Sequence, residues 1–210
     1  TVFLRSSNRI YVRHCTFQSS YTWYSITTVS SGNIEILNCT FADVYSTDRN
    51  GAIRVDFSIN ITTISGCTFQ GNIISAGLIS ISNSNGRMHI TNCTFQNSTG
   101  SHFAINVTGS RESIYITDCV FQNNVAPLIS IESSGPIKIA DCIFRNNNMI
   151  QISTHCSDDV NISNSTFQDN SNYGMLITMS NSSSGISIAD CNFVNNTVTF
   201  VINAELIEHI

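Results

Sequence analysis

The chain has 210 residues, a formal net charge of −5 and only 11% charged residues, against about 25% in a typical soluble domain. An apolar content of 41% at such low charge excludes a disordered chain. The acidic balance and the lack of a basic cluster argue against a nucleic-acid partner. No apolar run approaches the roughly 18–20 residues of a membrane helix.

One phrase recurs eight times along the chain: an alternating apolar strand, a turn residue, Cys-x-Phe and then a polar, Asn-rich tail. The Cys position is occupied by Cys15, Cys39, Cys67, Cys93, Cys119, Cys142, Ser165 and Cys191. Successive members lie 24, 28, 26, 26, 23, 23 and 26 residues apart. A period near 25 residues is typical of one coil of a solenoid, with the variation confined to one turn.

Three short strands are expected in each repeat. The alternation in Ile114-Tyr115-Ile116 has period two, which indicates a strand with one buried face. A strand is expected before this segment at 52–55, 78–81, 104–107, 128–131 and 149–152, and Cys-x-Phe forms another. The sequence therefore predicts an all-β, single-stranded parallel β-helix of about eight three-stranded coils, forming one domain over residues 1–210.

A coil of this size cannot bury its apolar side chains alone, so neighbouring coils about 4.8 Å away must cover them. This predicts two inward columns. The phenylalanine column is Phe17, Phe41, Phe69, Phe95, Phe121, Phe144, Phe167 and Phe193. The cysteine column is Cys15, Cys39, Cys67, Cys93, Cys119, Cys142 and Cys191, with Ser165 as its eighth member.

The residue before each Cys is expected to form a tight turn. These positions are His14, Asn38, Gly66, Asn92, Asp118, Asp141, Asn164 and Asp190. Gly, Asn and Asp tolerate a left-handed backbone best. We also expect the Asn side chains of this column to hydrogen-bond along the stack as an asparagine ladder.

These features resemble the right-handed parallel β-helix repeat superfamily, which includes pectate lyases and polygalacturonases. The pattern is most similar to polymorphic outer-membrane protein repeats, which combine Phe-x-x-Asn with Gly-Gly-Ala-Ile. Phe69–Asn72 and Phe121–Asn124 match the first motif, and Gly51-Ala52-Ile53 is a shortened form of the second. The resemblance implies a right-handed fold and, by analogy, an adhesive role.

The outward rows of the strands carry no paired carboxylates in neighbouring coils, which acid–base hydrolysis would require. One row is Arg54, Ser80, Asn106, Ser130 and Gln151. The next is Tyr11, Glu35, Thr63, His89, Tyr115, Lys138, Asn161 and Ser187. The motifs of polygalacturonases and the Asp/Arg arrangement of pectate lyases are also missing. We therefore expect no catalytic residues, no cofactor and no metal.

The cysteines offer no local zinc motif, because a 25-residue period supplies neither a close pair nor a nearby His. We expect a stack of small buried side chains, with reduced thiols or a few strained bridges rather than a complete disulfide ladder. Cys156 lies outside the column beside His155. Its pairing with Cys142 in an oxidising compartment is left open.

Nine Asn-x-Ser/Thr sequons occur, where chance alone would give roughly six. Six fall at predicted outward or loop positions and are candidates for N-glycosylation in a eukaryotic secretory source: Asn60, Asn97, Asn106, Asn161, Asn181 and Asn195. The other three fall in the predicted ladder, where the side chain should be occupied: Asn38, Asn92 and Asn164.

Two further patterns have simple explanations. An outward Thr row (Thr16, Thr40, Thr68, Thr94 and Thr166) is interrupted by Val120 and Ile143. It is similar to the surface of ice-binding solenoids, but the β propensity of Thr also explains it. Tyr21, Trp23 and Tyr24 form an aromatic cluster that suits sugars, although it equally suits the cover of a long turn.

We therefore expect a non-enzymatic structural or adhesive segment of an extracellular or cell-surface glycoprotein. The chain opens and closes on apolar stretches, whereas solenoids usually end in polar caps. This predicts self-association end to end, as in a fibre, or contact with flanking repeats of the same chain. The alternatives are a carbohydrate-active or carbohydrate-binding, pectate-lyase-like β-helix whose site lies in flanking sequence, and an ice-binding solenoid.

Overall fold

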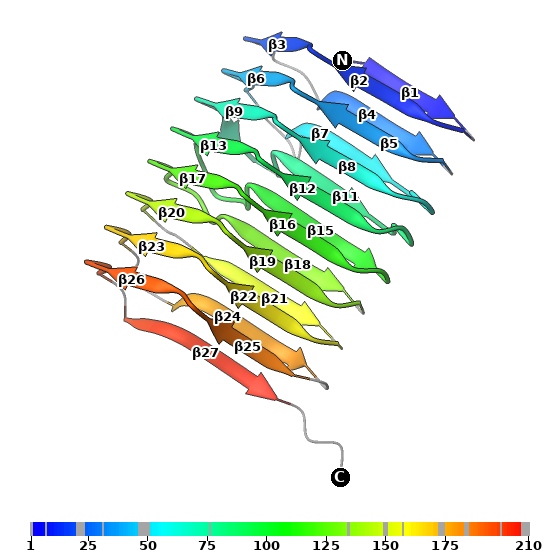
Figure 1. The fold of residues 1–210 in the computed structure, drawn as a ribbon. Helices are drawn as coiled ribbons and strands as arrows, with labels where there is room; N and C mark the ends of the chain where they lie inside the picture. The colour runs from blue at the N-terminus through cyan, green and yellow to red at the C-terminus, as the bar shows by residue number, and fades with distance from the viewer. Residues whose placement is uncertain are drawn as a thin grey trace.

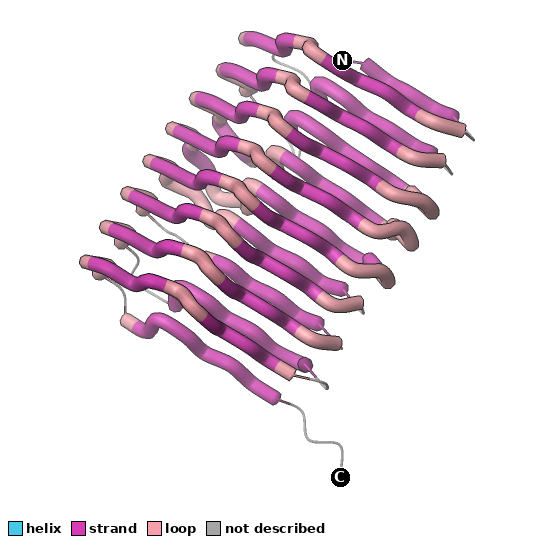
Figure 2. Tube along the Cα trace, in the orientation of Figure 1, coloured by secondary structure: helices cyan, strands magenta, loops and turns pink. Residues whose placement is uncertain are grey.

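The chain winds into a stack of parallel β-coils, from β1–β3 at one end to β26 and β27 at the other (Figure 1). The computed structural model describes residues 2–6, 8–19, 24–30, 32–45, 51–75, 77–133, 135–148, 151–156, 158–171, 175–182, 185–197 and 199–206. Within these ranges every regular element is a strand, joined by turns and loops (Figure 2).

Three parallel sheets form the sides of the stack, which confirms the predicted parallel solenoid. Sheet A is β1 (Val2–Ser6), β4 (Tyr24–Ser30), β7 (Gly51–Asp56), β11 (Ile79–Ser82), β15 (Ile105–Ser110), β18 (Ile129–Ser133), β21 (Ile152–Cys156), β24 (Met175–Ser182) and β27 (Phe200–Leu206). Sheet B is β2 (Ile10–Arg13), β5 (Ile34–Leu37), β8 (Thr62–Ser65), β12 (Met88–Thr91), β16 (Ile114–Thr117), β19 (Ile137–Ala140), β22 (Val160–Ser163) and β25 (Ile186–Ala189). Sheet C is β3 (Thr16–Gln18), β6 (Thr40–Ala42), β9 (Thr68–Gln70), β13 (Thr94–Gln96), β17 (Val120–Gln122), β20 (Ile143–Arg145), β23 (Thr166–Gln168) and β26 (Asn192–Val194).

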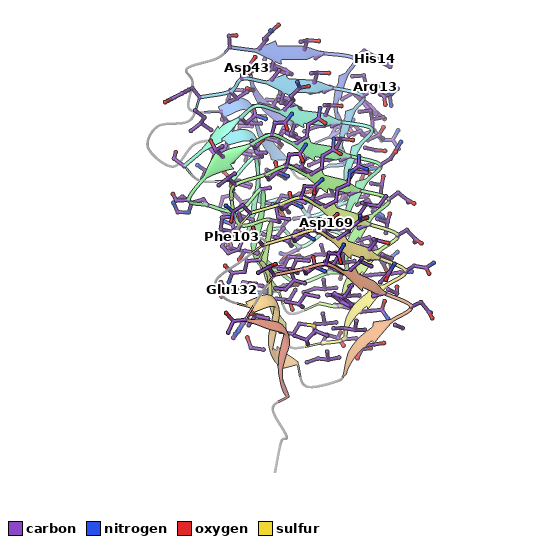
Figure 3. All side chains as sticks on the ribbon, turned by 90° about the vertical axis from the view of Figure 1, so that its left-hand side faces the viewer. Arg13, His14, Asp43, Phe103, Glu132 and Asp169 are labelled. Atoms are coloured by element: carbon purple, nitrogen blue, oxygen red, sulfur yellow. The ribbon has the colours of Figure 1, made fainter. Side chains whose placement is uncertain are left out.

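The phenylalanine column forms the spine of the core, as predicted. The strands of sheet C pair in register, so that each Phe lies opposite the Phe of the next coil. Successive ring centroids are 4.7–5.0 Å apart, and the ring planes differ by only 2–7°. The rings from Phe41 to Phe167 are fully buried, whereas Phe17 and Phe193 at the two ends are partly buried. Figure 3 shows the side chains along the whole stack.

The residue before each Cys has a left-handed backbone, as predicted, with φ between 52° and 64°. The buried asparagine ladder, however, lies in a different turn. It is built by the Asn of the Phe-x-x-Asn motif: Asn72, Asn124, Asn147, Asn170 and Asn196. The pre-Cys residues face outward instead, and among the described residues Asn164 Nδ2 donates to Asp141 Oδ1 of this column at 3.0 Å. The predicted location of the ladder is therefore wrong.

Each ladder Asn serves two neighbouring coils. Asn147 Nδ2 donates to the carbonyl oxygen of Phe121 at 2.9 Å and to Asn170 Oδ1 at 3.0 Å. Asn147 Oδ1 accepts from the backbone and side-chain nitrogens of Asn124, both at 3.0 Å. Because a buried polar group without a partner is costly, this network stabilises the turn after sheet C.

Two local features differ from the expectation. A fourth, short ladder borders the ladder turn, formed by β10 (Ile73–Ile74), β14 (Thr99–Gly100) and isolated bridges through Val125 and Asn148. Of the strand expected at 149–152, residues 149–150 lie outside the described residues, and β21 begins at Ile152, so that Ser153 pairs with Ser130 in the outward row. Gln151 instead precedes the strand, and its backbone oxygen accepts from Leu128 and Ile129.

Candidate functional site

The cysteine column is a buried structural element. Cys39, Cys67, Cys93, Cys119 and Cys142 are buried, and Cys15 and Cys191 are half-buried. All seven thiols are free. Each thiol from Cys39 to Cys142 donates to a carbonyl oxygen of the preceding coil at 3.5–3.7 Å. The backbone of Cys156 ends β21, and its side chain lies outside the described residues.

The pKa values of Cys39 and Cys67 are raised, whereas side-chain hydrogen bonds with Cys119 and Cys67 lower the pKa of Cys93. Desolvation raises the pKa of Cys39 above its ordinary value of 9.0. The neighbouring thiol of Cys93, together with burial, raises the pKa of Cys67 well above that value. A thiol that stays protonated is a poor nucleophile and a poor metal ligand. The buried thiols of the column pack in the core of the stack.

The predicted glycosylation candidates differ in exposure. Asn60, Asn97 and Asn195 are exposed, whereas Asn106 and Asn161 are half-buried on the outward faces of sheets A and B. The side chain of Asn181 lies outside the described residues. Asn38, Asn92 and Asn164 are exposed at the pre-Cys turns, on the outside of the coils. Which sequons are occupied stays a prediction.

The outer face of sheet C carries an amide chain that sequence reasoning missed. Gln96 Nε2 donates to Gln70 Oε1 at 3.1 Å, and Gln122 Nε2 donates to Gln96 Oε1 at 2.6 Å. Arg145 Nε completes the chain by donating to Gln122 Oε1 at 2.9 Å. The signal was the recurring Gln directly after Phe. The predicted Thr row runs beside it in register, and Val120 and Ile143 interrupt it as expected.

The outer face of sheet B holds smaller groupings. The rings of His89 and Tyr115 stack with centroids 4.9 Å apart. Arg13 Nη2 forms an ion pair with Glu35 Oε2 at 2.8 Å, and the Arg13 guanidinium lies 4.7 Å from the Tyr11 ring centroid. The Arg13–Glu35 and His89–Tyr115 contacts join consecutive coils through the pairing of β2 with β5 and of β12 with β16, whereas Arg13 and Tyr11 lie on the same strand, β2.

A groove of about 410 Å³ lies on the outer face of sheet A. We call it the sheet A groove; its lining residues are Tyr24, Arg54, Ser75, Ser80, Ser82, His102 and Asn106. Arg54, Ser80 and Asn106 come from β7, β11 and β15, where they are paired in register. Ser75 and His102 come from the connections that precede β11 and β15. Phe103 follows His102 in the sequence, and Glu132 belongs to β18 of sheet A. In Figure 3 both Phe103 and Glu132 lie on the side of the molecule opposite Arg13 and His14.

Arg54 is the charged centre of this groove. Its Nε atom donates to Asp56 Oδ2 at 2.7 Å, and its guanidinium lies 5.8 Å from the Tyr24 ring centroid. The Asp56 side chain is only 10% exposed, and its Oδ1 atom is buried with no hydrogen-bond partner. Tyr24 was predicted as part of an aromatic cluster; Tyr21 and Trp23 lie outside the described residues.

Glycine keeps the groove open. A Cβ atom on Gly77 would lie 2.7 Å from Ser80 Oγ and 3.3 Å from Asn106 Cβ. A Cβ atom on Gly51 would lie 1.6 Å from the carbonyl oxygen of Gly77, too close for any side chain. The two glycines therefore let adjacent coils approach closely and leave the space beside Ser80 and Asn106 unfilled.

A second, smaller groove of about 280 Å³ lies at the turn between sheets A and B. It is lined by Ile59, Asn60, Ile61, Asn85, Gly86, Arg87 and Glu112. Ile59 and Ile61 are exposed, as is Phe57, which has a left-handed φ of 56°. Three exposed apolar side chains therefore lie near the sequon residue Asn60.

The described part of the chain contains no cluster of three or more His, Cys, Asp or Glu side chains that could hold a metal ion. Among the same residues there is also no helix with the length and apolar character needed to cross a membrane.

Comparison with known proteins places the chain in a family. The model of the family described as "Right handed beta helix region" matches residues 1–158 and 51–205. The chain belongs to this right-handed β-helix family. Its closer likeness to polymorphic outer-membrane protein repeats stays a prediction. Comparison with curated proteins finds no match.

Among solved structures, the chain is similar to the Streptococcus pneumoniae surface protein and adhesin PfbA. The identity is 11% and the TM-score 0.36, over 98% of this chain and 67% of PfbA. A second PfbA structure gives 10% identity and a TM-score of 0.27, over 86% and 71%. The plasmid-mediated fluoroquinolone resistance protein QnrB1 gives 12% and 0.17, over 77% and 82%. Superpositions at these TM-scores are too poor to support a functional inference.

Proposed function

We propose that this chain is a non-enzymatic structural or adhesive segment of an extracellular or cell-surface protein. The observation that carries this proposal is the unbroken stack of coils. All three sheets pair in parallel from coil to coil, and the phenylalanine column runs through eight of them. Hydrogen bonds along the axis and a continuous core resist bending, which suits a rigid spacer that holds surfaces apart.

The outer surface supports the same proposal. The outward rows of sheets A and C are rich in Ser, Thr, Asn and Gln, and two ion pairs, Arg13–Glu35 and Arg54–Asp56, are found among the described residues. Such a surface makes many weak hydrogen bonds without strong charge. It suits multivalent contact and N-glycans, with Asn60, Asn97 and Asn195 as the exposed members of the six predicted glycosylation candidates.

End-to-end assembly forms part of the proposal. β1, β2 and β3 lie at one end of the sheet orders, and β27, β25 and β26 at the other. Terminal strands of a sheet present unpaired backbone groups, which pair readily with another strand of the same geometry. Another coil, from a second copy or from flanking repeats, would extend all three sheets in the same register.

The location is tested with antibodies raised against the purified chain. Labelling of intact source cells, without permeabilisation, is the expected result. Labelling that requires permeabilisation would overturn the surface role. As a parallel test of the non-enzymatic role, the purified chain is incubated with a panel of polysaccharides, and new reducing ends are measured. A steady release of reducing ends would show that the chain is an enzyme.

A further inference from the structure

The turn between β7 and β8, residues 57–61, exposes three large apolar side chains. Phe57 is 59% exposed, Ile59 54% and Ile61 43%. Apolar side chains that gather on the surface of a soluble protein usually mark a place that another group covers. We call these residues the β7–β8 turn. A group that covers the turn would be stabilised by the apolar area it removes from water.

Hydrogen bonds hold the β7–β8 turn in one shape. The Oγ atom of the buried Ser58 donates to the carbonyl oxygen of Asn60 at 3.2 Å and accepts from Thr62 Oγ1 at 3.1 Å. The carbonyl oxygen of Ser58 accepts from the backbone nitrogen of Asn85, in the next coil, at 2.7 Å. Because a fixed turn loses little conformational freedom on binding, its apolar side chains form a preorganised surface.

Phe57 lies at a position where the backbone disfavours a bulky side chain. Its φ is 56°, and the residues at the same point of the next two coils are Asn83 and Gly109, with φ of 51° and 66°. Asn and Gly tolerate this left-handed backbone, whereas an aromatic residue is an outlier there. Such an outlier points to a functional role. It places an exposed ring three residues before Asn60.

The smaller groove, of about 280 Å³, lies against this turn. Ile59 and Ile61 give it an apolar side, and the opposite charges of Arg87 and Glu112 leave its lining without net charge. Its volume is close to the lower end of small-molecule sites, roughly 300 Å³, which suits a single ring. Asn60, the exposed acceptor residue of a sequon, belongs to the same lining.

From these observations we infer that the β7–β8 turn is the docking surface of an N-glycan attached to the chain's own Asn60. The first N-acetylglucosamine lies in the smaller groove with its apolar face on Ile59 and Ile61, and Phe57 flanks it. The other exposed candidates, Asn97 and Asn195, line neither of the two grooves. The inference rests on the extracellular location in the proposed function, for a eukaryotic secretory source.

The sugar donor is an oligosaccharide joined to a polyprenol lipid through a pyrophosphate. Asn60 Nδ2 forms a bond to C1 of the first N-acetylglucosamine and loses a proton, while the bond from C1 to the pyrophosphate oxygen breaks and its electron pair leaves with the lipid pyrophosphate. The sequon requires the hydroxyl of Thr62, which is buried in the folded stack. Attachment therefore precedes the folding of this coil, which then closes against the sugar.

The test uses the chain secreted from a eukaryotic cell, with its glycans trimmed enzymatically to one N-acetylglucosamine. Peptide mass spectrometry measures the occupancy of Asn60, and NOE spectra record contacts between the sugar protons and the methyl groups of Ile59 and Ile61. We expect an occupied Asn60 and cross-peaks to both residues. An unoccupied Asn60 in the secreted chain would overturn the site, and an attached sugar without these cross-peaks would overturn the docking.

Asn195 offers a matched control, because it is an exposed sequon residue outside both grooves. Asn60→Gln should lower the unfolding temperature of the secreted, trimmed chain by about 2–4 °C, as for the loss of one modest contact in a chain of this length. Asn195→Gln should leave it unchanged. In the chain made in a bacterium, which carries no glycan, Asn60→Gln should also be neutral. Equal losses in the two secreted variants, or the same loss in the bacterial chain, would contradict a stabilising sugar at Asn60.

A change of the apolar surface separates docking from mere attachment. Ile59→Ser with Ile61→Ser alters two exposed side chains and keeps the sequon intact. In this background the sugar should remain attached, and Asn60→Gln should no longer lower the unfolding temperature. An undiminished loss would show that the sugar does not lie on these side chains, which overturns the inference.

A second copy of the chain is the competing occupant of the turn. Sedimentation velocity of the secreted, trimmed chain is compared with that of its Ile59→Ser variant. Because the sugar already covers the turn, the variant should show the same state of association. Association that Ile59→Ser abolishes would show that a second copy covers the turn instead. These measurements use the purified chain, so their failure is distinguishable from failure of the surface-labelling experiment on source cells.

Discussion

Replacement of Phe95 by Ala at the centre of the phenylalanine column should lower the free energy of unfolding by about 3–5 kcal/mol, as for other buried Phe→Ala changes. Phe95 is fully buried and stacks on Phe69 and on Phe121, both with centroids 4.7 Å away. The two ring pairs account for about 1–3 kcal/mol of that loss, at 0.5–1.5 kcal/mol each. The remainder is the lost apolar burial and the cavity.

The position in the stack provides internal controls. Phe17 is partly buried at one end of the column, and its one described ring partner is Phe41, at 5.0 Å. Phe17→Ala should therefore cost about half as much, roughly 1.5–2.5 kcal/mol. Phe3 lies outside the column in β1 and is 63% exposed, so Phe3→Ala should change stability by less than about 0.5 kcal/mol.

Urea unfolding followed by circular dichroism at 25 °C measures all three variants. Each coil of a solenoid contacts only its neighbours, so a central cavity can also separate the unfolding of the two halves. A broadened or two-step transition in Phe95→Ala would be consistent with this. A loss in Phe95→Ala no larger than that in Phe3→Ala would refute the role of the column as the stabilising spine.

Four other outcomes are expected. Asn147→Leu should lower the free energy of unfolding by about 1–3 kcal/mol for each backbone or amide group left without a partner. The control Asn148→Leu changes the exposed neighbour and should be nearly neutral in the same urea assay. Equal losses in the two variants would contradict a buried ladder. In a Cys156→Ser background, Cys15 and Cys191 should react with a thiol reagent at pH 8 well before the buried thiols. Burial raises the pKa of the Cys39 thiol above 9.0, so the contribution of this thiol to the free energy of unfolding is fully present below pH 9 and is lost as the pH rises further. The urea concentration at the unfolding midpoint should therefore fall above pH 9. A midpoint that rises there would contradict a buried, protonated Cys39. Asp118 has a φ of 56°, so Asp118→Val should cost about 1–2 kcal/mol, and Asp118→Gly should be nearly neutral; similar losses in the two would argue against the left-handed turn.

The periodic part of the structure was predictable from the sequence. Phe and Cys recur two residues apart at a fixed point of each coil, and strands in register place identical residues opposite one another. The same periodicity explains why the pre-Cys turn was identified correctly. In these segments one physical rule, burial of one face of a strand by the next coil, decides both the sequence pattern and the geometry.

The location of the asparagine ladder was not decided by that rule. Asn recurs both before Cys and three residues after Phe, and both positions lie in turns. Only the backbone geometry separates them: Asn92 is left-handed and exposed, whereas Asn124 is buried and bonded to the next coil. The signal was present in the Phe-x-x-Asn motif, where a polar residue follows a buried Phe at a constant distance.

The sheet A groove could not be predicted from the repeat. Its strand residues, such as Ser80 and Asn106, belong to an expected outward row. Its walls come from Ser75 and His102, which lie in connections of variable length without periodic signal. Its shape depends on Gly51 and Gly77, whose role becomes clear only from the close approach of two coils.

The central claim, that the chain winds once for each Phe of the column, is tested most directly by proton–proton NOE spectroscopy on a deuterated chain with protonated Phe rings. Centroid separations of 4.7–5.0 Å predict cross-peaks that connect each ring with the next along the column, from Phe17 to Phe193. Missing contacts between successive rings such as Phe69, Phe95 and Phe121, or strong contacts between rings two or more coils apart, would contradict the solenoid and the rod-like role built on it.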